Sequence, residues 1–174
     1  MDQVERIVSV TMISALLTVP SSAHVLLDNK EAAVGGSVKA VFVVPHGCSG
    51  FDTTRLRVKI PEGVIAVEPE AKSGWTIETV KGKYAAVYDY QGAKVGEGVQ
   101  EVSWSGGRVP DKTRDTFPLD LYLTDSLKPD SMLYFPVVQE CEQGVSRWIE
   151  IPAEGSDPHD YKRPAPGIKL VPRS

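Results

Sequence analysis

The stretch from Pro20 to Asn29, PSSAHVLLDN, holds the residue with the clearest capacity for chemistry, a histidine that directly follows small residues. If the chain is cut between Ala23 and His24, that one residue carries two metal-binding nitrogens, the terminal amine and the ring Nδ1. The terminal amine has a reference pKa of about 7.7–8.0, so a metal ion displaces its proton at little cost near neutral pH. Two nitrogens with a carboxylate or water favour tetragonal Cu(II). His24 therefore predicts a copper site, the alternative being that cleavage leaves a histidine first by accident.

The two other histidines are weaker candidates for a metal ligand. His46, in VVPHGC, lies in phase with Phe42 and Val44 on an apolar face, where a histidine is more often hydrogen-bonded at the rim of a core than a ligand. We keep His46 as a lower-ranked candidate for a metal ligand. His159 lies in a polar, proline-rich stretch and is expected to be solvated.

Trp148 stands out in the segment VSRWIEI. Val145, Ile149 and Ile151 occupy alternate positions, so the period of two puts Trp148 on the opposite, polar face with its even-numbered neighbours. A large aromatic residue on a polar face marks a site or covers a hydrophobic edge. Both interpretations stay open at this point.

The beginning of the chain is typical of an export signal. The apolar run 7–20 is too short to span a bilayer as a helix but has the length of a signal core, and Ser21–Ala23 offers small residues at the cleavage positions. Asp2 and Glu5 depart from the positive charge usual before such a run, and a buried N-terminal strand or helix is the alternative. We expect a signal peptide over 1–23, a periplasmic or secreted protein that starts at His24, and no membrane anchor.

The two cysteines, Cys48 and Cys141, both remain after this cleavage. An even pair in an exported chain favours a disulfide, against the alternative of two buried free thiols. With a net charge of -4 and no basic run, the chain lacks the features of nucleic-acid binding.

From His24 onward, apolar residues alternate with polar ones almost everywhere, which is the pattern of half-buried strands. The cleanest examples are 55–60 and 117–123. The other strand candidates are 24–28, 37–45, 64–68, 75–80, 84–90, 98–104, 132–140 and 145–151. About nine strands separated by glycine- and proline-rich turns predict an all-β protein, an antiparallel β-sandwich of immunoglobulin-like shape over 24–151. Residues 152–174 form a proline-rich C-terminal tail that packs on the sandwich or extends from it, with APGIKLV as a further edge-strand candidate.

Catalytic signatures are missing from the sequence: it has no phosphate-binding glycine loop, no Gly-x-Ser-x-Gly elbow and no His-Glu-x-x-His motif. We therefore expect that the protein is not an enzyme.

Five stretches in order resemble the YcnI-like copper-binding domain, an exported bacterial β-sandwich. They are HVLLDNKEAAVGGSVKAVFVVPHGCSG, IPEGVIAVEPEAKSGW, VSWSGGRVP, LYFPVVQECEQGVSRWIEIP and PAPGIKLVP.

The resemblance implies a Cu(II) site in which the first mature residue binds through its amine and Nδ1, completed by a carboxylate and a neighbouring tryptophan. His24 matches the first residue and Trp148 the tryptophan. Glu31 is the preferred carboxylate, with Glu150 and Asp28 in reserve.

Three functions follow. The resemblance favours an exported copper chaperone or buffer for copper homeostasis, which exchanges the copper ion with other periplasmic copper-handling proteins. A copper-dependent oxidative enzyme would need a second histidine, for which His46 is the sequence candidate. A copper-independent binding module is the third possibility, because sandwich folds host many roles.

Overall fold

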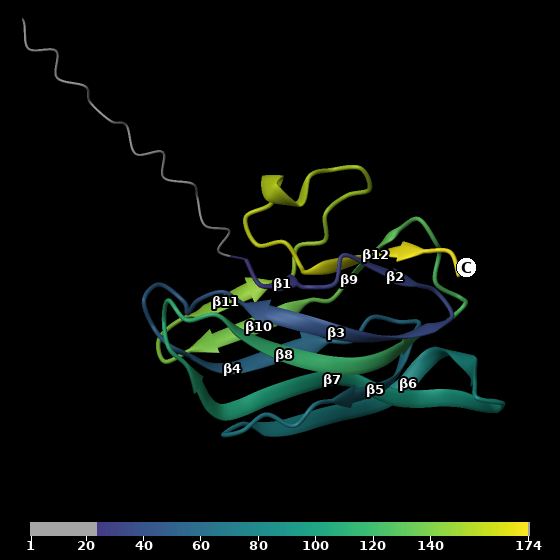
Figure 1. The fold of residues 1–174 in the computed structure, drawn as a ribbon, viewed down its shortest axis with the longest axis horizontal. Helices are drawn as coiled ribbons and strands as arrows, with labels where there is room; N and C mark the ends of the chain where they lie inside the picture. Colours follow the sequence, from purple (N-terminus) through teal and green to yellow (C-terminus); the bar gives the residue numbers. More distant parts are fainter. Residues whose placement is uncertain (1–23, 174) are drawn as a thin grey trace, which may run out of the picture.

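The computed structural model describes residues 24–173. The expected signal peptide, 1–23, lies outside the described residues. Twelve strands and one short 3-10 helix, η1, form the described chain (Figure 1). The strands are β1 Leu26–Leu27, β2 Glu31–Ala33, β3 Gly36–Val44, β4 Thr53–Lys59, β5 Val64–Pro69, β6 Thr76–Tyr90, β7 Ala93–Val109, β8 Asp115–Leu123, β9 Met132–Tyr134, β10 Val137–Cys141, β11 Val145–Trp148 and β12 Gly167–Val171; η1 is Pro158–Asp160.

Two antiparallel sheets pack against each other and enclose one hydrophobic core. The four-stranded sheet has the order β1-β3-β8-β5 and the five-stranded sheet the order β11-β10-β4-β7-β6. Their inner faces meet at Trp104 and Phe117, whose rings lie edge to face with centroids 5.4 Å apart. This arrangement confirms the predicted all-β sandwich.

Alternation along β4 and β8 sets which side chains enter this core. Leu56 and Val58 are fully buried between exposed or half-buried neighbours, and the odd-numbered residues of β8 from Phe117 to Leu123 point inward. Burying one such side chain contributes about 1.5–3 kcal/mol, so the period of two is enough to orient each strand. The strand predictions for 55–60 and 117–123 are confirmed.

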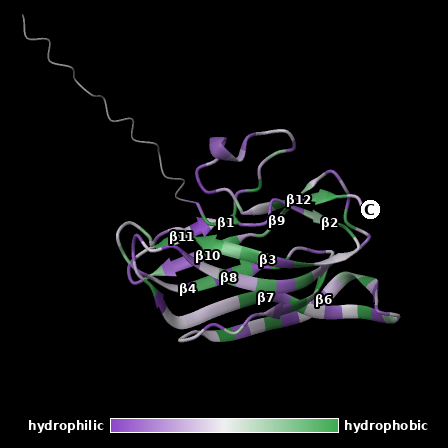
Figure 2. Cartoon of the chain, in the orientation of Figure 1, coloured by the Kyte–Doolittle hydropathy of each residue, from purple (hydrophilic) through white to green (hydrophobic). Residues whose placement is uncertain are grey.

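Some strand boundaries differ from the prediction. The two expected strands 75–80 and 84–90 are one long strand, β6, which pairs with an equally extended β7. The expected strand 132–140 divides into β9 and β10 around Pro136, because proline has no N–H to contribute to a ladder. Figure 2 shows mixed hydropathy along β6, which is mostly exposed at the edge of its sheet.

The C-terminal segment returns to the fold through β12. This strand is the central strand of a small third sheet, parallel to β2 and antiparallel to β9, and buries Ile168 and Leu170. The stretch APGIKLV therefore supplies a strand, but a central one instead of the expected edge strand. Within residues 24–173, no helix is long and apolar enough to cross a membrane.

Cys48 and Cys141 form a disulfide, with Cα atoms 5.9 Å apart. It joins the loop after β3 to the end of β10, and so links the two sheets. The predicted disulfide is confirmed.

Candidate metal centre

His24, the first described residue, lies partly buried just before β1. Its ring packs against the indole of Trp148 with centroids 5.4 Å apart and an interplanar angle of 62°. These two residues are 124 positions apart in the sequence, and the fold brings them together because β1 and β11 lie at the edges of the two sheets. The pair that the family resemblance implies is therefore adjacent.

The predicted face of Trp148 is wrong. Trp148 is only 6% exposed, whereas Val145, Ile149 and Ile151 are 43%, 47% and 53% exposed. The reason is the pairing of β11 with β10, in which Trp148 lies opposite the fully buried Val137. Residues directly opposite in an antiparallel pair share a face, so the partner strand turns the tryptophan inward despite the apolar residues on the other face.

A buried polar network holds this indole in place. Trp148 Nε1 donates a hydrogen bond to Gln139 Oε1 at 3.0 Å. The amide of Gln139 donates in turn to Thr53 Oγ1 and to the backbone carbonyl of His46, both at 2.8 Å. Gln139 is 1% exposed and Thr53 is fully buried, so the bonds that Gln139 makes with Trp148 and Thr53 are shielded from water. We call these bonds the Gln139 network; they fix one side of the His24 environment.

The other side of His24 is formed by residues 152–166, which leave the sandwich after β11 and return as β12 (Figure 1). We call this segment the cover loop. Glu150 closes its base, because its backbone N–H donates to Arg163 O and its backbone carbonyl accepts from Ala165 N–H. The Glu150 carboxylate accepts a further bond from Arg163 N–H at 2.6 Å. The loop is thus tied at its two ends.

The cover loop carries His159 to His24. The two histidines, with residues of β9 and the stretch 164–167, line one cavity of about 240 Å³. His159 belongs to η1, which begins after Asp157, whose side chain accepts from the His159 backbone N–H at 2.8 Å. Figure 2 shows this turn as hydrophilic, and His159 is exposed, as expected. The sequence did not predict that His159 lines the same cavity as His24.

The pKa of His24 lies below its ordinary value. Burial is the main cause, and the nearby His159 lowers the pKa further, whereas a hydrogen bond to the backbone of Lys162 raises it. A lowered pKa favours the neutral imidazole, which is the form that binds a metal ion.

The three carboxylate candidates are engaged elsewhere. Glu31 forms an ion pair with Lys169 at 3.3 Å, and Asp28 forms one with Arg114 at 3.4 Å. Glu150 closes the cover loop. Of the residues that line the His24 cavity, all in the described part of the chain, none is acidic.

His46 is half-buried, and its ring Nδ1 lies 2.5 Å from Gly47 O. Its backbone belongs to the Gln139 network, but His46 does not line the His24 cavity among the residues described. Between residues 24 and 173, no group of three or more His, Cys, Asp and Glu side chains is placed to hold a metal ion.

Sequence reasoning missed Gln139 and the position of His159. Gln139 alternates with Val137 and Cys141, so a polar residue on the inward phase of a strand was a readable signal. No comparable signal exists for His159, because the cover loop has no periodicity from which its path could be inferred.

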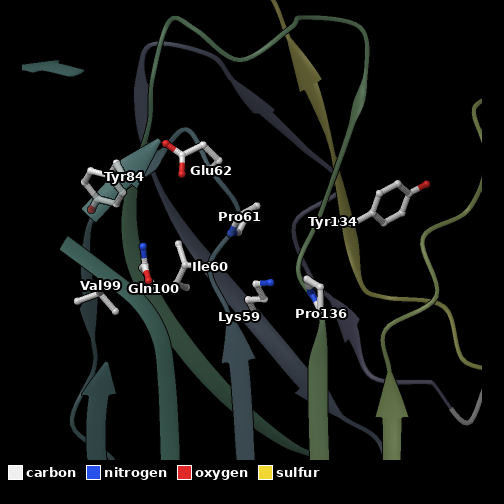
Figure 3. A pocket seen from close by; sticks show the side chains of 9 residues that line it. All are labelled: Lys59, Ile60, Pro61, Glu62, Tyr84, Val99, Gln100, Tyr134 and Pro136. Carbon is white, nitrogen blue, oxygen red and sulfur yellow. The ribbon is translucent and has the colours of Figure 1, made fainter. Parts of the chain in front are cut away.

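A second hollow, of about 510 Å³, lies beside Glu62, Tyr84 and Gln100 (Figure 3). Its acidic side chain, Glu62, accepts hydrogen bonds from Tyr88 Oη at 2.5 Å and from the backbone N–H of Ala85 at 2.9 Å. These bonds attach β6 to the loop before β5. We therefore interpret Glu62 as a structural residue.

The two packed sheets define an immunoglobulin-like β-sandwich. A protein from Nocardia farcinica, described as uncharacterized and as having an immunoglobulin-like fold, is similar in crystal structure, with a TM-score of 0.62 and 25% sequence identity. The similarity covers 86% of this chain and 99% of the Nocardia chain.

Residues 24–170 match the model of the domain of unknown function DUF1775, and the chain belongs to this family. The YcnI-like domains that the sequence resembles are part of the same family. Among curated proteins, no sequence matches the chain.

Proposed function

We propose that the protein is an exported Cu(II)-binding protein, a copper chaperone or buffer, that binds the ion through His24 after cleavage before this residue. The observation that carries the proposal is the contact between His24 and Trp148, with ring centroids 5.4 Å apart. The matched domain also begins at His24, where an N-terminal ligand would stand.

The donor chemistry around His24 fits copper. The free amine and Nδ1 of one residue can chelate a single ion, and nitrogen donors suit Cu(II). Burial lowers the pKa of His24 and so favours the neutral ring. A metal ion that binds near neutral pH therefore seldom has to displace a proton from the ring. Because side chains alone assemble no three-residue metal site within 24–173, the terminal amine is an essential donor in this proposal.

Trp148 has a distinct part in the proposed site. Its indole packs against the ring of His24, so it would exclude water from one side of an ion held there. The Gln139 network holds the indole, so the ring is oriented before the metal arrives. The resemblance prefers Glu31 as the carboxylate ligand, which requires Glu31 to leave its exposed ion pair with Lys169.

The test compares two forms of the chain that begins at His24, one with a free amine and one acetylated at that amine. Acetylation removes one donor and adds no new nitrogen. We expect the free form to bind one Cu(II) and the acetylated form to bind it more weakly, by more than the roughly 10–100-fold loss typical of an outer-sphere partner. His24→Gln serves as the control for the ring donor. Equal affinity of the free and acetylated forms would rule out the N-terminal site.

A copper chaperone or buffer and a copper-independent module also differ in this experiment. If the free form binds no Cu(II), the module becomes the leading interpretation. In that case, a protein partner that is recovered equally well with and without copper would support the binding module.

A further inference from the structure

The cover loop brings a second imidazole to the His24 cavity. We infer that His159 is a direct ligand of the metal ion bound at His24, so that the site holds two imidazoles instead of one. This inference rests on the proposed function, because it assigns a further ligand to the same copper site. It concerns the part of the chain that the sequence presents only as a polar tail.

The first support is shared geometry. His24 and His159 line the same cavity of about 240 Å³, which is a space of the size of a few side-chain groups and is free of acidic residues among those described. An ion at the His24 ring would therefore have His159 as a neighbour.

The second support is the local order of the cover loop. Asp157 accepts from the His159 backbone N–H, and Pro158 provides the fixed backbone angle that starts η1. Tyr161 Oη accepts from the Ala153 N–H at 2.9 Å, which connects the two halves of the loop. These bonds hold the His159 backbone at one place over the cavity.

The third support is availability. Within the described residues, the ring of His159 has no hydrogen-bond partner, and its only bond is through the backbone. In contrast, the ring of His46 is close to Gly47 O, and Glu31 is in an ion pair. His159 is thus the donor that can turn toward a metal without breaking a native contact.

A second imidazole also completes the donor set. The amine and Nδ1 of His24 with one nitrogen of His159 supply three nitrogens, a set suited to the tetragonal preference of Cu(II). With three nitrogens, none of the engaged carboxylates needs to move. A second histidine is also what a copper-dependent oxidative enzyme would need. Having the same ligands as such an enzyme does not establish that the protein reacts with oxygen.

The experiment counts imidazoles by pulsed electron paramagnetic resonance on the Cu(II)-loaded chain that begins at His24. Three forms are compared: the unaltered chain, His159→Ala and His46→Ala. His46→Ala is the matched control, because it removes a histidine that does not line the cavity. We expect two imidazoles in the unaltered chain and in His46→Ala, and one in His159→Ala.

The affinity should follow the same order. Since removing an outer-sphere partner already costs about 10–100-fold, losing His159 should weaken Cu(II) binding by at least about tenfold. Circular dichroism should show the same fold for all three forms, because His159 is exposed.

The failures of the two proposals are distinguishable. One imidazole in the unaltered chain, with His159→Ala identical to it, overturns the His159 ligand and leaves the His24 site standing. Loss of an imidazole in His46→Ala instead also overturns the inference, in favour of His46. Absence of Cu(II) binding by the unaltered chain overturns the proposed function and the inference together.

Discussion

The two sides of the His24 cavity are built in different ways. On one side, Trp148 is buried and hydrogen-bonded to Gln139, inside a sheet that the disulfide ties to the loop after β3. On the other side, the cover loop is mostly exposed between residues 153 and 163, although Pro152 and residues 164–166 are buried. It depends on Glu150 at its base and on a short turn around His159. The first side is part of the hydrophobic core, whereas the second is attached to it.

Because of this difference, substitutions on the two sides should affect different properties of the protein. Changes on the buried side remove core contacts or leave polar groups unpaired, so they lower the free energy of unfolding. Changes in the exposed part of the cover loop, 153–163, affect exposed groups, so they should alter which side chains line the His24 cavity with little effect on the fold. Three further experiments test whether the two sides of the cavity differ in this way.

Removing the disulfide should have the largest effect. The chain-entropy relation gives a loss of about 4–5 kcal/mol for Cys48→Ser with Cys141→Ser, because the two residues are 93 positions apart. Urea unfolding followed by circular dichroism measures this loss. A change below about 1 kcal/mol would show that the buried side does not depend on the disulfide.

Gln139→Leu should have the next largest effect. The substitution leaves Trp148 Nε1 and the Thr53 hydroxyl without their buried partner, which costs about 1–3 kcal/mol per group. Urea unfolding measures the loss, and the indole N–H resonance of Trp148 should shift. His159→Ala is the comparison from the cover loop and should change the unfolding free energy by no more than about 0.5 kcal/mol. Equal losses for the two variants would remove the contrast.

Of the three experiments, Glu150→Ala should have the smallest effect on global stability. It removes the hydrogen bond from Arg163 N–H, worth about 0.5–1.5 kcal/mol, but leaves the two backbone bonds of Glu150 in place. Faster hydrogen exchange is expected within residues 152–166, with unchanged exchange in β4 and β8. Glu150→Gln keeps an acceptor and should behave as the unaltered chain. Unchanged exchange in Glu150→Ala would mean that the carboxylate does not hold the loop.

The sandwich was predictable from the sequence because each strand is oriented by its own alternation. Leu56 in β4 and Phe117 in β8 are buried as their patterns indicate, and pairing of the two cysteines was inferred from the expected export and an even count. These inferences need only local sequence or simple counting. The predicted fold class is therefore confirmed.

The candidate site was predictable only in part. His24 and Trp148 are adjacent, but the orientation of Trp148 depends on its position opposite Val137, which the sequence of β11 alone does not contain. His159 depends on the path of an aperiodic loop, and that path is set by long-range bonds of Glu150. Where tertiary contacts override local pattern, sequence reasoning failed.

The closed base of the cover loop makes this segment an exchangeable part of the molecule. Because Glu150 joins the two ends and β12 is held between β2 and β9, the length of the loop is not fixed by the sandwich. Doubling the length of a flexible loop costs only about 0.6 kcal/mol, so insertions in the exposed part, 153–163, should destabilise the fold little. Evolution or an engineer can therefore vary the side chain that this loop brings to the His24 cavity without redesigning a single strand.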